Sequence, residues 1–322
     1  MERSYELYVG GKVIATPCFF PSISSIKTNL LPVEYLEFLV SIRFPYLLIS
    51  AYDIHHASSE DRSAVQDMLA RAYEGGTIIL LDSGNYESFW HQDDTWSIET
   101  FEEICRTVPS HLTFCFDNQG PPSSSRTIAE DVVARVIRTG GVFPKGTVLP
   151  IIHAPKASLP EVAVEVVDRL RPIMLAIPER ELGEGLVERA ETIIRIRSAM
   201  NRADYYCPLH LLGTGNPLSI LVYTKCGADS FDGLEWCQTC VHHTTAILYH
   251  FQQLDFTSDH VVSVQDLDLP YSERVMLNNL LFFGKWLGEI SLRLRTNCWA
   301  EFASKYLPQR IVSQLTNTLS RC

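Results

Sequence analysis

The stretch TIILLDSG, residues 77–84, decides the fold class. Apolar and β-branched residues run without a break and end abruptly in aspartate, serine and glycine, which favour turns. A continuous apolar run of this length predicts a strand that is buried on both faces, as in a parallel sheet. Asp82 then stands where the strand ends, either as a turn residue or as a catalytic group at the mouth of a barrel.

Seven similar runs recur along the chain, and amphipathic helical patterns separate most of them. The runs occupy residues 18–22, 46–52, 112–118, 147–154, 173–179, 207–213 and 229–233, and the clearest helical patterns occupy residues 61–76, 125–141 and 185–202. Eight buried strands alternating with helices predict an α/β fold, a (β/α)8 TIM barrel. An open doubly wound sheet is the alternative, but its glycine-rich phosphate motif is absent after the first strand.

We expect the barrel to lie between two smaller parts. The predicted organisation is an N-terminal β-hairpin at residues 1–17, a catalytic barrel at residues 18–256 and a C-terminal helical extension at residues 257–322. With 322 residues, 46% of them hydrophobic, the chain has enough apolar surface for a full core. It shows neither an apolar segment of roughly 20 residues nor a signal peptide, and its nine cysteines are scattered, so we expect a cytoplasmic protein with no membrane partner.

The C-terminal extension differs in charge from the rest of the chain. Six basic and only two acidic residues lie between residues 285 and 322, although the whole chain carries a formal net charge of −11. One interpretation is an amphipathic helical layer with a solvated basic face. The other is a surface that binds a nucleic-acid backbone and stacks aromatic rings on bases. The residues of this second interpretation are Lys285, Arg293, Arg295 and Lys305, with further charges at Arg310 and Arg321 and rings at Trp286, Trp299, Phe302 and Tyr306.

Polar residues stand at the ends of most of the predicted strands. They are Asp82, Asp117, His153, Glu179, the segment GTGNP at residues 213–217, and Asp232. The carboxyl ends of barrel strands meet on one rim, where barrel enzymes carry their active sites. A single acid at such an end usually caps the next helix, but several unpaired carboxylates cost too much free energy to crowd together without a use. The rim is therefore the predicted active site.

Five segments, in the right order, resemble the motifs of the tRNA-guanine transglycosylase superfamily from about residue 14 to about residue 236. ATPCFFPSISSIKT (15–28) resembles the first barrel strand of the family, and LDSGNYES (81–88) resembles its DSGG(F/Y)Q motif. The other three are FCFDNQGPP (114–122), similar to FDxCxP, LLGTGNPLSIL (211–221), similar to MGVGxPxDIL, and GADSFDG (227–233), similar to G(V/I)DMFDC.

The resemblance implies a role for each matching residue. Asp232 matches the nucleophile that attacks the sugar C1′ atom and holds it covalently, and Asp82 matches the general acid/base. Asp117 matches the carboxylate that reads the N1/N2 edge of a guanine-type base. The other residues implied to surround the base are Tyr86, which matches a stacking aromatic, His153 at the position of the family's glutamine, and His210, Leu212 and Gly213 on the opposite wall.

These residue types suit the exchange of one base for another at C1′, which resembles the reaction of a retaining glycosidase. One carboxylate makes and breaks the covalent bond, while a second group moves the proton. Two carboxylates close together also push their pKa values apart, so that one is ionised while the other is protonated. The target base must leave its stack before either carboxylate reaches it.

Four departures from the family pattern favour its DNA-acting branch, which inserts a 7-deazaguanine such as preQ0 into DNA. The zinc site of the family, Cys-x-Cys-x2-Cys with a downstream His, is missing. Residues 233–237 lack the family's tRNA-contacting sequence, His153 replaces a glutamine, and PERELGEG at residues 178–185 replaces a loop of small residues. The weak alternative zinc cluster is Cys237, Cys240, His242 and His243, whose CxxC spacing fits the metal.

The sequence therefore predicts a DNA guanine transglycosylase that needs no cofactor and uses DNA, a 7-deazaguanine base and an accessory ATPase as partners. Three alternatives stay open. The first is a tRNA-guanine transglycosylase, and the second is a non-catalytic nucleic-acid-binding subunit of the same superfamily. The third is a zinc or flavin barrel enzyme whose motif matches arise by chance.

Overall fold

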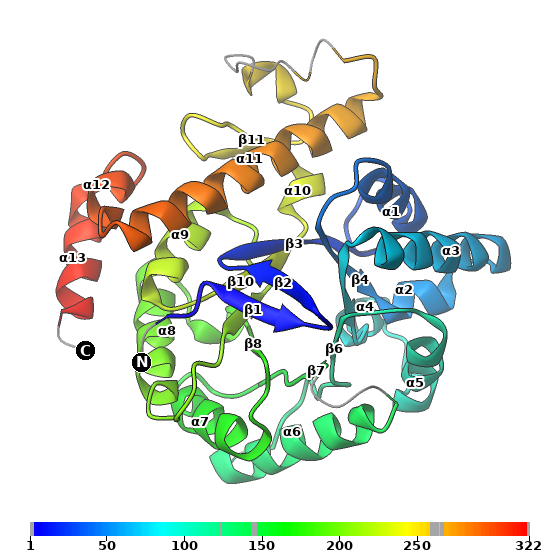
Figure 1. The fold of residues 1–322 in the computed structure, drawn as a ribbon, viewed down its shortest axis with the longest axis horizontal. Helices are drawn as coiled ribbons and strands as arrows, with labels where there is room; N and C mark the ends of the chain where they lie inside the picture. The colour runs from blue at the N-terminus through cyan, green and yellow to red at the C-terminus, as the bar shows by residue number, and fades with distance from the viewer. Residues whose placement is uncertain (1–2, 123, 143–146, 258–263, 265–266, 321–322) are drawn as a thin grey trace.

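The computed structural model describes residues 3–122, 124–142, 147–257, 264 and 267–320. Eight parallel strands form a barrel surrounded by helices (Figure 1). The strands are β3 Cys18–Ile23, β4 Tyr46–Ser50, β5 Ile78–Asp82, β6 Leu112–Phe114, β7 Val148–Leu149, β8 Leu175–Pro178, β9 Leu209–Leu212 and β10 Ser230–Gly233. They are ordered β7-β6-β5-β4-β3-β10-β9-β8 and coincide with the eight predicted runs. The predicted TIM barrel is confirmed.

The barrel closes between the two ends of this strand order. A parallel bridge joins Ile151, just after β7, to Ala176 of β8. The Ile152 N–H donates to the Ala176 carbonyl at 2.9 Å, and the Ala176 N–H donates to the Pro150 carbonyl at 2.9 Å. Closure pairs the last strand edges and brings the carboxyl ends of all eight strands onto one rim.

Helices cover the outside of the barrel (Figure 1). They are α1 Pro32–Ser41, α3 Ser59–Gly75, α5 Ile98–Thr107, α6 Ser125–Gly140, α7 Leu159–Leu170, α8 Leu186–Met200 and α9 Pro217–Cys226. The predicted helical patterns correspond to α3, α6 and α8. Ser58 caps α3 by accepting the Asp61 N–H at 3.1 Å, and Ser124 caps α6 by accepting the Thr127 N–H at 3.3 Å. In the described part of the chain, no helix is both long and apolar enough to span a membrane.

Short helices occupy the rim, where they follow the carboxyl ends of four strands. They are α2 Ala51–His56 after β4, α4 Asn85–His91 after β5, the 3₁₀ helix η1 Glu179–Leu182 after β8 and α10 Glu235–Gln238 after β10. These segments are compact because each begins within a few residues of the preceding strand. The rim side chains that these short helices carry are therefore positioned by a hydrogen-bonded backbone.

The predicted N-terminal hairpin is present and closes the other end of the barrel. It consists of β1 Glu6–Val9 and β2 Lys12–Ala15, paired antiparallel. Leu7 and Ile14 are buried in the same cluster as the barrel residues Phe20, Leu80 and Leu112. The hairpin lies across the centre of the barrel in Figure 1. Among the described residues, apolar side chains thus fill this end of the barrel.

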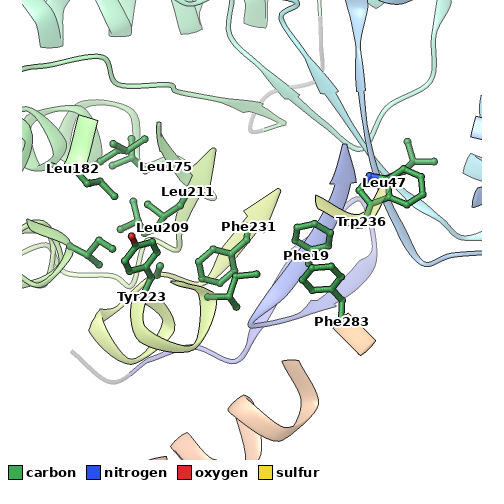
Figure 2. Packing of buried hydrophobic residues seen from close by; sticks show 14 of the residues in the cluster. Phe19, Leu47, Leu175, Leu182, Leu209, Leu211, Tyr223, Phe231, Trp236 and Phe283 are labelled. Atoms are coloured by element: carbon green, nitrogen blue, oxygen red, sulfur yellow. The ribbon is translucent and has the colours of Figure 1, made fainter. Parts of the chain in front are cut away.

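The chain continues past the barrel through a small hairpin and a helical layer. These elements are β11 Thr239–Val241, β12 Leu248–His250, η2 Leu254–Thr257, α11 Tyr271–Arg295, α12 Trp299–Ala303 and α13 Gln309–Leu319. The long helix α11 packs on the barrel, and Figure 2 shows its Phe283 stacked on Phe19 of β3, with ring centroids 4.3 Å apart.

The aromatic residues of this layer face the barrel and not the solvent. Trp286, Trp299 and Phe302 are buried. The Trp286 indole N–H donates to the Pro217 carbonyl at 3.0 Å, and the Trp299 indole N–H donates to the Leu221 carbonyl at 3.1 Å. The expectation that these three rings stack on nucleic-acid bases is wrong, because they fill the interface between the layer and α9.

Candidate active site

The carboxyl rim of the barrel surrounds a cavity of about 430 Å³. This volume lies within the roughly 300–1,000 Å³ that is typical of ligand sites. Most of the predicted site residues line it, namely Asp82, Tyr86, Asp117, His153, Leu212, Gly213 and Asp232. The cavity is also rich in charged groups that the sequence motifs did not indicate, namely Glu87, Arg180, Arg189 and Glu235, together with Glu179 at a strand end.

Asp232 is fixed by three hydrogen bonds at the end of β10. The Ser22 hydroxyl donates to Oδ2 at 2.7 Å, and the Gly213 N–H donates to Oδ1 at 3.0 Å. His210 Nε2 lies 3.1 Å from the same Oδ1. These hydrogen bonds hold the buried Asp232 carboxylate in one orientation, which an attacking group requires.

His210 does not line the cavity, although the resemblance placed it against the base. Its ring is fully buried below Asp232. Nδ1 lies 2.8 Å from the Ser230 hydroxyl while Nε2 contacts the Asp232 carboxylate. His210 therefore orients the candidate nucleophile from beneath, and the wall facing the base is left to Leu212 and Gly213.

Asp82 ends β5 and enters the cavity with little hydrogen bonding. The Gly84 N–H donates to its Oδ2 at 3.2 Å, so Asp82 also shapes the turn. Removal from water raises the pKa of Asp82 well above its ordinary value, and the nearby charges of Glu87 and Asp117 raise that pKa further. A raised carboxyl pKa favours the protonated form, which a general acid requires.

The turn after Asp82 links two neighbouring strands. Gly84 has a φ of +79°, and a Cβ atom there would fall 2.5 Å from the Cβ of Tyr52, so only glycine fits. The turn aims Ser83 and Asn85 at Asp117. The Ser83 hydroxyl donates to Asp117 Oδ1 at 2.6 Å, and Asn85 Nδ2 donates to the same oxygen at 2.9 Å.

Asp117, at the end of the fourth predicted strand, forms an ionic chain with His153 and Glu181. His153 Nε2 lies 2.8 Å from Asp117 Oδ2, and His153 Nδ1 lies 2.5 Å from Glu181 Oε1. Because both neighbours are acceptors, both ring nitrogens carry a proton and His153 is an imidazolium. Burial lowers the pKa of His153, but the hydrogen bonds and charges of the two carboxylates outweigh it and raise that pKa to about 9.

The same contacts keep Asp117 ionised. Burial alone would raise the pKa of Asp117, but the hydrogen bond and charge of His153, with the hydrogen bonds from Ser83 and Asn85, hold it at about 2. Gln119 Nε2 adds a fourth donor, 2.5 Å from Oδ2. Each oxygen of Asp117 therefore accepts two hydrogen bonds, which fills its usual capacity.

Gln119 is the exposed member of this group and connects it to the mouth of the cavity. Its Oε1 accepts a hydrogen bond from Arg180 Nη2 at 2.5 Å. Arg180 itself is exposed. Asp117 is therefore covered from the solvent side by a side chain that can swing out without unfolding the barrel.

Glu87 is a buried carboxylate beside Asp82. It is 3% exposed and accepts hydrogen bonds from the hydroxyls of Ser24 at 2.5 Å and Ser50 at 3.0 Å. Burial, together with the nearby charge of Asp53, raises the pKa of Glu87 to about 7. This residue follows the predicted stacking residue Tyr86 directly and stands at the last position of the DSGG(F/Y)Q motif, so the motif match could have found it, although no role was assigned to it.

Two more carboxylates line the far wall. Glu179 accepts hydrogen bonds from Arg189 Nη1 at 2.7 Å and from the Tyr223 hydroxyl at 2.9 Å. Glu235 lies over Gly215, where a Cβ atom would collide with its carboxylate. Burial raises the pKa of Glu235 to about 7. Two of the segments that depart from the resembled family pattern, residues 178–185 and 233–237, thus each add an acid to the cavity.

The described residues include no group of three or more His, Cys, Asp or Glu side chains that could hold a metal ion. The weak zinc alternative, which comprised Cys237, Cys240, His242 and His243, is not gathered into such a group. Cys240 Sγ contacts Asn278 Nδ2 at 3.8 Å, and His243 Nε2 lies 2.9 Å from the Asn278 carbonyl oxygen. Hydrogen bonds from α11 thus hold this hairpin.

The basic residues of the C-terminal layer are distributed over α11 and the segment after α12. Lys285 and Lys305 are exposed. Arg293 Nη2 lies 3.1 Å from Glu289 Oε2, and the guanidinium of Arg295 lies 4.5 Å from the centroid of the Tyr5 ring. None of the four lines the cavity. The remaining basic residues are Arg310, which is exposed, and Arg321, which lies outside the described residues.

The chain is similar in sequence to two known transglycosylases. No protein family model matches the chain. A tRNA-guanine(15) transglycosylase of Thermococcus onnurineus is 21% identical over 251 residues, which are 73% of this chain and 40% of that protein. A tRNA-guanine(15) transglycosylase of Pyrobaculum aerophilum is 22% identical over 334 aligned positions, covering 93% of this chain and 63% of that protein.

These similarities support the transglycosylase superfamily that the five motifs predicted. The chain spans only 40% and 63% of the length of the two relatives.

Proposed function

We propose that this protein exchanges guanine for a 7-deazaguanine base in DNA through a covalent intermediate between Asp232 and the sugar C1′ atom. The observation that carries the proposal is the pair of carboxylates in one cavity with opposite surroundings. Asp232 is fixed by three hydrogen bonds, whereas Asp82 has one weak donor and a raised pKa. A base exchange needs such a pair, one carboxylate as nucleophile and one as proton carrier.

The first half of the exchange releases guanine. The flipped base enters the cavity between Tyr86 and Leu212, and an oxygen of Asp232 attacks C1′. The bond between C1′ and N9 breaks, its electron pair leaves with the base, and Asp82 donates a proton to the departing guanine. The sugar is then held as an ester of Asp232.

The second half reverses these steps with a different base. A 7-deazaguanine takes the place of guanine, Asp82 accepts the proton from its N9, and N9 attacks C1′. The bond between C1′ and Asp232 breaks, which returns the carboxylate. Asp82 gives one proton to the departing guanine and takes one from the incoming base. It is therefore protonated again at the end of each cycle, and the exchange needs no other proton source.

Asp117 reads the N1–H and N2–H edge of both bases. Because its oxygens already accept four hydrogen bonds, an incoming base must displace one donor. Gln119 is the donor that leaves, since it is exposed and the other three are buried or held by the turn after β5. In this proposal the base therefore replaces the Gln119 amide as a hydrogen-bond donor to Asp117.

The choice of DNA rests on the parts that differ from the tRNA-contacting pattern. The segment after Asp232 folds into α10, where Trp236 and Cys237 are buried and the Trp236 indole N–H donates to the Ser22 carbonyl at 2.9 Å. Trp236 and Cys237 thus pack inside the molecule, whereas Glu235 and Gln238 of the same segment line the cavity. In a duplex the target base must still be unstacked, and an accessory ATPase that opens the duplex stays part of the proposal.

A second candidate function is the same exchange in tRNA. The names of the two relatives favour it, because both are tRNA-guanine(15) transglycosylases. The catalytic residues would keep their roles, and only the nucleic acid would differ.

The decisive experiment offers the purified protein labelled preQ0 with duplex DNA, single-stranded DNA and unmodified tRNA in parallel. We expect label in DNA, most in the single strand, where flipping is cheapest. Label in tRNA alone would establish the second candidate. An Asp232→Ala variant serves as the control, and mass spectrometry of nucleosides from DNA and tRNA of a host that expresses the protein identifies the product. No label in any acceptor would reject both functions.

A further inference from the structure

Helix α4 carries a row of three aromatic rings from the cavity to the surface. Tyr86 lines the cavity. Its ring centroid lies 6.2 Å from that of Trp90, at an angle of 68°, and the Trp90 centroid lies 5.8 Å from that of Phe89, at 81°. Trp90 is 48% exposed and Phe89 is 65% exposed. The row is therefore continuous with the candidate active site and ends in solvent.

Trp90 differs from the other tryptophans of the chain. The chain has five tryptophans, and the other four are buried. Their indole N–H groups donate to backbone carbonyl oxygens, in Trp96, Trp236, Trp286 and Trp299. An exposed indole forgoes the free energy that burial of its large apolar surface supplies. Its position beside the mouth of the cavity suggests that a ligand covers it.

Positive charge accompanies the row. Lys27 is exposed, and its Nζ lies 4.6 Å from the centroid of the Trp90 ring. The Lys27 carbonyl accepts a hydrogen bond at 2.9 Å from Gln238, which lines the cavity. At the other end of the row, Arg180 lines the cavity together with Tyr86. Burial raises the pKa of the Tyr86 hydroxyl, and the charge of Glu87 raises it as well, whereas a hydrogen bond from Trp90 and the charge of Arg180 lower it. Aromatic rings flanked by cations are the usual surface for unpaired nucleotides.

We propose that Trp90 and Phe89, together with Lys27, bind the nucleotide next to the target nucleotide in an unpaired strand. Lys27 lies over the indole, which is 48% exposed, so the neighbouring base stacks on the exposed part of Trp90 while the ammonium meets the backbone phosphate. This inference rests on the proposed function, because the occupant is the strand whose target base enters the cavity. Stacking on a π-face tolerates any base, so this platform of Lys27, Phe89 and Trp90 sets the path of the strand and not its sequence.

The experiment measures kcat and KM on a short single-stranded oligonucleotide with one target guanine. Trp90→Ala should raise KM about tenfold, the lower part of the range for removal of one base stack, and leave kcat unchanged. An abasic residue beside the target guanine should raise the wild-type KM by a similar factor. Combined with Trp90→Ala, it should add little, because both changes remove the same interaction. Trp90→Phe should restore most of the affinity, and Lys27→Ala should lower the salt slope by about one unit.

The matched control is Tyr8→Ala. Tyr8 is also an exposed aromatic residue, 67% exposed against 48% for Trp90, and lies on the hairpin at the opposite end of the barrel. Unchanged KM in both Trp90→Ala and Tyr8→Ala, with normal wild-type exchange, would overturn the platform and leave the proposed function standing. The same oligonucleotides are also bound to an Asp232→Ala variant and followed by fluorescence anisotropy. If the wild type catalyses no exchange, the proposed function fails, while weaker binding by the double variant Asp232→Ala, Trp90→Ala still supports the platform.

Discussion

Asp82 ends β5 and Asp117 lies three residues beyond the end of the neighbouring strand β6, and both line the same cavity. The structure nevertheless gives the two carboxyl groups opposite surroundings. The pKa of Asp82 is raised well above its ordinary value, first by burial and then by the charges of Glu87 and Asp117. The pKa of Asp117 is held at about 2, because hydrogen bonds and the His153 charge outweigh its burial. Position on the barrel rim therefore does not decide what a carboxylate does.

The difference comes from the donors that the loops deliver. One N–H, from Gly84, reaches Asp82, whereas four donors reach Asp117. Two of those four come from the turn that starts with Asp82 itself. The same turn thus directs its donors away from the proton carrier and toward its neighbour, which separates the two pKa values more than burial alone would.

Replacement of Asp232, the proposed nucleophile, is expected to have the largest effect. Asp232→Ala should lower the rate of base exchange by several powers of ten, because no covalent intermediate forms. Circular dichroism should show a folded barrel. The measurement is incorporation of labelled guanine into DNA. Near-wild-type incorporation would show that Asp232 is not the nucleophile. Asp82 and Asp117 would then remain as the residues to which a role in the cavity is assigned.

Asp82→Asn tests the proton-carrying side of the comparison. The amide keeps the shape of the turn but cannot carry a proton, so exchange should slow about 10²- to 10⁴-fold. Affinity for the free base should change little, since Asp117 remains. Trapping of the covalent adduct and release of guanine are the two readouts. Adduct formation at the wild-type rate would show that Asp82 only shapes its turn.

Asp117→Asn tests the recognition side. An asparagine has one acceptor oxygen where the base needs a carboxylate, and one partner group is left unpaired, at a cost of roughly 1–3 kcal/mol or more. Calorimetry should therefore show weaker binding of guanine and preQ0. The prediction is the reverse of that for Asp82→Asn, and equal affinity in both variants would end the division of roles between these two residues.

The sequence predicted the barrel and the acids at its strand ends because both depend on local pattern. Apolar runs predict buried strands, and Asp82 and Asp117 each follow such a run directly, whereas Asp232 was located by the motif GADSFDG. The partners of these acids were beyond reach of that reasoning. Ser22 meets Asp232 across 210 positions of sequence, and Glu181 meets His153 across 28. The first contact joins the paired strands β3 and β10, which lie at opposite ends of the barrel sequence. The second joins two rim segments that follow β7 and β8, and no periodicity encodes either pairing.

In the C-terminal layer the sequence pattern is visible, but it fits two different interpretations. Basic and aromatic residues alternate there as they would on a nucleic-acid surface and as they would on an amphipathic helix. The sequence does not say which face of α11 is covered, and the structure places Trp286 and Trp299 against α9. Two exposed rings close to the cavity, Phe89 and Trp90, instead lie on α4, where the motifs indicated only Tyr86.

A triple variant of the C-terminal layer compares its basic side chains with the rim. Arg293, Arg295 and Lys305 changed to Ala should weaken DNA binding a few-fold, whatever the sequence. The salt dependence should flatten by about one log-log unit for each phosphate that the variant no longer binds. Binding is measured by anisotropy across a salt series. If affinity and slope are unchanged, these residues only solvate the layer, and strand binding belongs to the rim alone.

The smallest effect concerns stability, and it isolates the ionic chain that holds Asp117. His153 has a folded pKa of about 9, above the ordinary value of about 6.5. Its contribution to the free energy of unfolding is therefore complete below pH about 6.5 and disappears as the pH rises through about 9. The difference in melting temperature between wild type and His153→Gln should be a few degrees near pH 6 and shrink toward pH 9 to 10.

His111→Gln is the matched control for this pH dependence. The pKa of that buried histidine is lowered to about 4, mainly by burial, so its contribution is complete above pH about 6.5 and disappears as the pH falls through about 4. The two differences in melting temperature should thus change with pH in opposite directions. A His153→Gln difference that does not change between pH 6 and 10 would mean that the imidazolium is not formed. The low pKa of Asp117 would then depend on its neutral donors, chiefly Ser83 and Asn85, and the histidine would no longer explain why Asp117 and Asp82 differ.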